Sequence, residues 1–92
     1  MDNRNVEYSL QILNEEKDFD KYYELEKDFI KAHAIANYDY IIEKNIYDIE
    51  DFIQEITIDI WVYSLNNIIE KNKYGNTIKN LVAKTIKKIN KK

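Results

Sequence analysis

Residues 48–61 read Asp48-Ile-Glu-Asp-Phe-Ile-Gln-Glu-Ile-Thr-Ile-Asp-Ile-Trp61 and decide the fold of this chain. Placed on a helix, their apolar side chains recur every three or four residues and form a core-facing stripe. That stripe consists of Ile49, Phe52, Ile53, Ile56 and Ile60, with Tyr63 just beyond. A second row at helical spacing mixes acids and an amide with two apolar residues: Asp51, Gln54, Glu55, Ile58 and Trp61. A fully solvated face would not carry Ile58 and Trp61, and a buried face would not carry acids and an amide without partners. This row therefore predicts a protein-binding face.

The composition indicates one small, soluble helical domain. The chain has 92 residues, of which 45 % are hydrophobic and 34 % are charged, as in globular proteins. It has no proline, one glycine and no cysteine, which favours long helices and excludes both disulfides and thiolate metal sites. No leader-like start and no run of eighteen apolar residues is present, so we expect neither secretion nor a membrane span, and a cytoplasmic location.

The charge is divided sharply between two parts of the chain. Residues 1–70 hold all 17 acidic residues and 6 basic ones, a net charge of −11, whereas residues 71–92 hold 8 lysines and no acid, a net charge of +8. This asymmetry predicts a basic helix that meets a polyanion. The alternative interpretation is that the lysines only complement the dipole of their own helix and the acidic neighbours.

Helical periodicity predicts an all-α fold, a small bundle of three main helices. The first main helix is expected to begin at Asp18 as its N-cap, the second to run over residues 48–72 with Asp48 as its cap, and the third to be the basic helix 77–92. The one glycine, Gly75, is the expected break between the last two helices.

Residues 1–14 have two interpretations. Their apolar residues alternate as in a strand, but three of them also fit a helical turn. Because a lone strand would need a partner, we expect either a loose arm or a short fourth helix. The remaining residues, 15–92, are expected to form the helical domain.

Residues for catalysis are not grouped in any known pattern. His33 is the only histidine and lies beside an apolar helical stripe, which is typical of a packed or half-exposed helix residue. There is no Ser-His-Asp set, glycine-rich phosphate loop or two-histidine metal spacing. We therefore expect no enzymatic activity, no cofactor and no metal site.

The stretch 48–61 resembles the second conserved region of bacterial RNA polymerase sigma factors, most closely the extracytoplasmic-function type. That family has an acidic pair, two apolar residues, Gln-Glu and then an apolar helix with a tryptophan, which here read Glu50-Asp51-Phe52-Ile53-Gln54-Glu55 and Trp61. Phe19-Asp-Lys-Tyr22-Tyr23 looks like the aromatic opening of the family's first helix, although the spacing from there to Asp48 is several residues longer than usual. The resemblance covers about residues 18–90, without the family's helix-turn-helix domain for the −35 element.

The resemblance implies a docking surface for core RNA polymerase. In the family, the acidic-amide row binds the clamp-helix coiled coil of the polymerase's largest subunit. Carried over, the polymerase-binding residues are Asp48, Glu50, Asp51, Gln54, Glu55, Ile58 and Trp61. A separate partner protein, or another stretch of chain, would then read the −35 element, and an anti-sigma factor is the alternative partner.

The resemblance also implies contact with promoter DNA. Thr77-Ile-Lys-Asn-Leu-Val-Ala-Lys84 is similar to the family's helix for the −10 element. The expected DNA-binding residues are Lys73, Tyr74, Asn76, Thr77, Asn80, Lys84, Lys87 and Lys88, with the lysines on phosphates and the polar residues near opened bases. Tyr74 is the only aromatic residue of this segment, where primary sigma factors carry several, so weak promoter melting is expected.

An alternative from a different class is a small acidic immunity or anti-defence protein. Its N-terminal part, with a net charge of −11, would mimic nucleic acid and bind one basic enzyme. The simplest form of this alternative is a helical bundle without any nucleic-acid contact.

Overall fold

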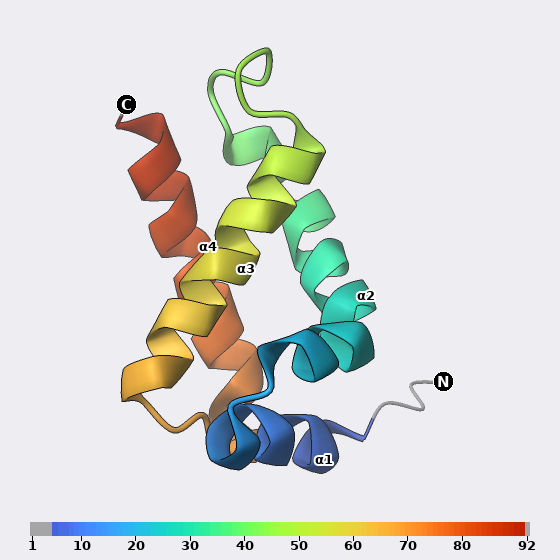
Figure 1. Ribbon diagram of the computed structural model, residues 1–92. Coiled ribbons are helices and arrows are strands. Elements are labelled where there is room, and N and C mark those ends of the chain that lie inside the picture. Colours follow the sequence, from blue (N-terminus) through green and yellow to red (C-terminus); the bar gives the residue numbers. More distant parts are fainter. Residues whose placement is uncertain (1–4, 92) are drawn as a thin grey trace.

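Four α-helices make up the fold in a computed structural model that describes residues 5–91 (Figure 1). They are α1 (Val6–Gln11), α2 (Phe19–Asn37), α3 (Ile49–Asn66) and α4 (Tyr74–Asn90), and the described part contains no strand. The prediction of a small all-α bundle with three main helices and a short N-terminal one is thus confirmed. The parts of the predicted segments 1–14 and 77–92 that fall on residues 1–4 and 92 lie outside the described residues.

Helix α3 packs against both α2 and α4 and thereby positions the residues of interest (Figure 1). The buried residues of α3 are Phe52, Ile53, Ile56, Ile60 and Ser64, while Ile49 and Tyr63 pack at the margin of the core. The side chain of Asp48 accepts a hydrogen bond of 2.9 Å from the backbone N–H of Asp51, so Asp48 is the N-cap as predicted. Asp18 caps α2 in the same way through Lys21.

The N-terminal residues belong to the same core as the long helices. Helix α1 is followed by a π-helical turn over Ile12–Glu16. Leu10, Ile12 and Leu13 are all buried, and they join the hydrophobic cluster formed by α2, α3 and α4. Of the two interpretations of this segment, the short helix describes Val6–Gln11.

The junction between α3 and α4 differs from the prediction. Helix α3 ends at Asn66, not near residue 72, because the side chain of Asn14 binds the next segment. Asn14 donates to the carbonyl of Ile69 (2.9 Å) and accepts from its N–H (3.0 Å), and Ile69 is buried. These tertiary contacts hold the segment after Asn66 out of the helix.

Helix α4 begins at Tyr74, three residues before the predicted start at Thr77. Tyr74 is buried against α2 and thus anchors the first turn. Gly75 lies inside this turn with a negative φ, so it does not form the expected left-handed break. The predicted position of the junction was wrong because contacts with Asn14, in the π-helical turn, and with α2 set it, not the glycine.

Candidate docking face and nucleic-acid interface

The outer face of α3 carries the row that the sequence singled out. Glu50, Asp51 and Gln54 are exposed, and Ile58 is 44 % exposed although it is apolar. Together with Tyr23 of α2, these four residues line a shallow groove between α2 and α3. Asp48 is exposed at the start of the helix and already serves as its cap. The structure thus brings Glu50, Asp51, Gln54 and Ile58 together on one accessible surface, whereas Glu55 turns toward α4.

Trp61 contributes less to that surface than the sequence suggested. Its ring centroid lies 5.0 Å from that of Phe19, and the side chain is only partly exposed. Trp61 therefore helps to hold α3 against α2. Two apolar residues that sequence analysis missed, Val62 and Leu65, are about half exposed on the same helix. Their spacing of four and seven residues from Ile58 could have placed them on the same helix face from the sequence alone.

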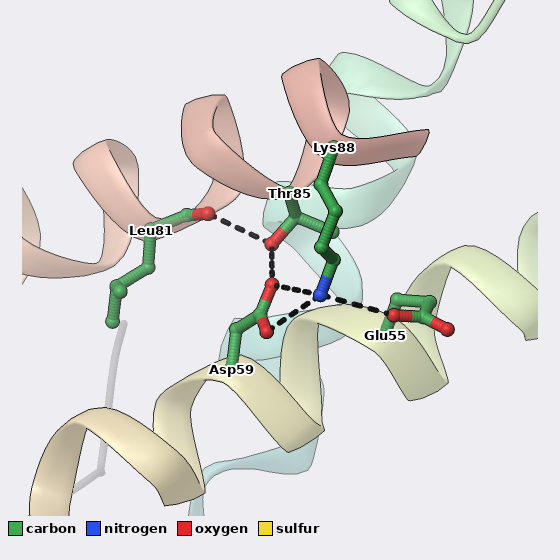
Figure 2. A network of polar contacts seen from close by, with 5 residues as sticks. All are labelled: Glu55, Asp59, Leu81, Thr85 and Lys88. Carbon is green, nitrogen blue, oxygen red and sulfur yellow. Dashed lines mark hydrogen bonds and ion pairs between the residues drawn. The ribbon is translucent and has the colours of Figure 1, made fainter. Parts of the chain in front are cut away.

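A polar network joins α3 to α4 and uses one residue from each predicted interface (Figure 2). The ammonium group of Lys88 lies 2.8 and 3.1 Å from the two carboxylate oxygens of Asp59, and 3.2 Å from Glu55. Thr85 donates to Asp59 as well, and it also bonds the carbonyl of Leu81 at 2.8 Å. Glu55 and Lys88, predicted to bind different partners, hold each other in the free chain.

The pKa of Lys88 reflects this network. Partial burial acts to lower the pKa, but the hydrogen bonds and charges of Asp59 and Glu55 together raise it above its usual value. Lys88 thus stays charged at neutral pH with two carboxylates beside it. Its first role in the free chain is to hold α4 on α3.

The outer face of α4 presents the other predicted DNA-binding residues to solvent. Asn76, Asn80, Lys84 and Lys87 are exposed, and among the described residues neither of these two lysines forms an ion pair. Lys73 is also exposed, although it pairs with Glu70 at 3.4 Å. This face offers positive charge and amide groups to a ligand.

A groove between α3 and α4 adds an aromatic residue that sequence analysis did not assign to DNA. Tyr63 of α3 lines it together with Thr77, Asn80, Leu81 and Lys84 of α4. Asn66 and Asn67, at the end of α3, line the adjoining groove with Tyr63 and Lys84. A ring, an amide and a lysine are thereby placed within one groove, with two further amides in the adjoining one, and only the fold could reveal this grouping.

The prediction that Tyr74 binds DNA is wrong. It is 2 % exposed, and its hydroxyl donates to a carboxylate oxygen of Glu26 at 2.9 Å and lies 2.7 Å from the hydroxyl of Tyr22. Its ring packs against that of Phe29 in a tilted arrangement, with 5.1 Å between the ring centroids. Burial, with the neighbouring Tyr22 and Glu26, raises the pKa of Tyr74 well above its usual range. The side chain therefore joins α4 to α2 inside the core and cannot meet a base.

Two further findings concern the described residues. Among residues 5–91, no group of three or more His, Cys, Asp or Glu side chains is placed to hold a metal ion. None of the helices within this range is long and apolar enough to cross a membrane.

Comparisons with protein-family models, with curated proteins and with solved structures found no significant match to this chain.

Proposed function

We propose that the chain is a sigma-like transcription initiation factor that binds core RNA polymerase through α3 and promoter −10 DNA through α4. The observation that carries this proposal is the outer face of α3. Asp51 and Gln54 are exposed there beside the half-exposed Ile58, directly across the helix from the buried Phe52, Ile56 and Ile60. A face with oriented polar groups around apolar side chains is typical of a protein interface.

The polymerase surface that fits this face is a coiled coil with basic and donor side chains. Asp51 would accept hydrogen bonds from an arginine or lysine, and Gln54 would bond a polar neighbour. Ile58 would add apolar contact. Glu55 is already paired with Lys88, so its contribution to a partner is offset by the pair that it leaves.

The outer face of α4 supports the second half of the proposal. Lys84 and Lys87 are exposed and unpaired among the described residues, as phosphate contacts require. With Tyr74 buried, the aromatic ring that lines a groove with Asn80 and Lys84 is that of Tyr63. Aromatic stacking and amide contacts are the means by which opened strands are held.

The proposal includes a separate partner protein, or another stretch of chain, that reads the −35 element. The factor would then act in the cytoplasm, where polymerase resides. An anti-sigma factor would silence it by covering the same face of α3.

The proposal is tested by affinity for purified core RNA polymerase from the source organism. The double variant Asp51→Ala/Gln54→Ala should bind at least about tenfold more weakly, because two polar contacts of about 1 kcal/mol each are lost. The matched control is Gln11→Ala/Asp28→Ala, which removes an exposed amide and an exposed carboxylate elsewhere. If the wild-type chain ignores polymerase and binds one basic enzyme instead, the acidic-mimic alternative replaces this proposal.

A further inference from the structure

Three apolar side chains form a ridge along the exposed face of α3. Ile58, Val62 and Leu65 are 44 %, 52 % and 50 % exposed, and they follow one another at spacings of four and three residues. A single exposed apolar residue is ordinary in a soluble protein. Three on consecutive turns of one helix face make a continuous patch, which is typical of a binding site.

This ridge begins where the polar part of the same face ends. At 100° per residue, Asp51 and Gln54 project within the same third of the helix circumference as the ridge residues Ile58, Val62 and Leu65. The whole face from residue 51 to residue 65 is about 21 Å long at 1.5 Å per residue. It is therefore acidic and polar at its N-terminal end and apolar at its C-terminal end.

Trp61 explains why the ridge is displaced from the row seen in the sequence. Its ring lies against Phe19, 5.0 Å between centroids, and thus points toward α2. The apolar contact assigned to Trp61 is available instead from two half-exposed residues: Val62, at the edge of the α3–α4 groove beside Lys84, and Leu65, one turn further on.

The position of Asp51 on this face limits which partner can cover the ridge. In a pair of copies with antiparallel α3 helices, the carboxylate of Asp51 would be desolvated against the apolar end at Leu65, and in a parallel pair Asp51 would meet Asp51. A helix of a different protein avoids both unfavourable contacts if its basic or hydrogen-bond-donor side chains lie opposite Asp51 and its apolar side chains lie opposite Leu65. Amphipathic helices bind with apolar anchors at this same spacing of four and seven residues.

We propose that Val62 and Leu65 form the second half of the polymerase-docking face and contact apolar side chains of the same coiled coil that Asp51 and Gln54 meet. This inference rests on the proposed function. Here Val62 and Leu65 supply affinity that salt does not screen, whereas Asp51 supplies a part that salt weakens.

The experiment measures affinity for purified core RNA polymerase at low and at high salt. The variant Val62→Ser/Leu65→Ser should bind about 30-fold more weakly, since two half-buried apolar contacts are lost, and the loss should be the same at both salt concentrations. Asp51→Ala should lose less at high salt than at low salt. The control Ile35→Ser removes an apolar side chain of α2 that is 67 % exposed and should bind as the wild type does. Each variant is first shown to melt at the wild-type temperature.

The outcomes separate the inference from the proposed function. If Asp51→Ala/Gln54→Ala weakens binding but Val62→Ser/Leu65→Ser does not, the extended face is wrong and the proposed function stands. If the wild-type chain does not bind polymerase, both are wrong. If the wild type is a dimer that Val62→Ser/Leu65→Ser converts to monomers without changing polymerase binding, the ridge serves a second copy and the inference is overturned.

Discussion

Helices α3 and α4 lie side by side in one small bundle but present opposite kinds of surface. The outer face of α3 carries acids, an amide and half-exposed apolar residues, whereas that of α4 carries lysines and asparagines. The first combination suits a protein partner, whose side chains can satisfy both parts. The second suits phosphates, which need charge but little apolar area. Under the proposed function, the two neighbouring helices would bind different partners.

The largest expected effect concerns the lysines of α4. Lys84→Ala/Lys87→Ala should weaken binding to a −10 single strand about 50-fold at low salt, because two phosphate contacts and their released counterions are lost. The slope of log affinity against log salt concentration should decrease in magnitude by about 1.4, because each of the two lost phosphate contacts contributes about 0.7. Filter binding across a salt series measures both. The control Lys27→Ala/Lys31→Ala, on α2, should change neither, and an equal loss in that control would mean that only net charge matters.

Replacing Tyr74 tests whether its role is structural. Tyr74→Phe leaves the carboxylate of Glu26 without one donor, so the free energy of unfolding should fall by about 1–3 kcal/mol. DNA affinity of the folded variant should equal that of the wild type. Urea denaturation with strand binding measures the two quantities, and a large loss of DNA affinity without a loss of stability would contradict the buried placement.

The pH dependence of the same variant gives a second check. The pKa of Tyr74 is raised in the folded chain, so its stabilising contribution is complete below the usual value of 10.0 and declines as the pH rises above that value. The difference in unfolding free energy between wild type and Tyr74→Phe should therefore shrink above pH 10. Denaturation at pH 8 and at pH 11 measures it, and a difference that grows instead would refute this origin.

Adjacent lysines allow a finer comparison. Lys88 is held by Asp59 and Glu55, whereas Lys87 faces solvent. Lys88→Met should lower the free energy of unfolding by about 0.5–1 kcal/mol, a small value because the side chain is 42 % exposed and water screens the pair. Lys87→Met should leave stability unchanged but weaken DNA binding more than Lys88→Met does. Thermal melting and single-strand binding of both variants measure these effects. A larger loss of DNA affinity for Lys88→Met than for Lys87→Met would mean that Lys88 leaves its carboxylate partners when DNA binds.

A similarly small effect is expected at the junction between the two helices. Gly75 lies in the first turn of α4 with a negative φ, and no heavy atom lies within 4 Å of the position of an added Cβ. Gly75→Ala should therefore raise the free energy of unfolding by about 0.5–1 kcal/mol. Chemical denaturation measures the change. Destabilisation would mean that Gly75 is a break after all.

Periodicity along the chain predicted most of the fold. The stripe from Phe52 to Ile60 and the caps Asp18 and Asp48 depend on neighbours within one or two turns, which a single sequence contains. The junction at Asn66–Tyr74 depends on Asn14, more than fifty residues away in the chain. Such a contact leaves no periodic signal.

The candidate site was predictable in part for the same reason. Exposure of Asp51 and Gln54 follows from their phase relative to the core stripe. Phase alone could not show that Trp61 would turn to Phe19, or that Glu55 and Lys88 would meet across two helices. The sequence suggested that Tyr74 is exposed because its hydrogen-bond acceptor, Glu26, is a charged residue, and charged residues are expected at the surface. In the fold, Glu26 is buried and accepts a hydrogen bond from the hydroxyl of Tyr74.

The central claim is that the outer face of α3 docks on RNA polymerase. The most direct test is the dissociation constant for purified core enzyme, measured for the wild-type chain, for Asp51→Ala/Gln54→Ala and for Gln11→Ala/Asp28→Ala. We predict specific binding by the wild type and by the control, and binding at least about tenfold weaker for the α3 variant. Equal affinity of all three chains, or no binding by the wild type, would contradict the claim.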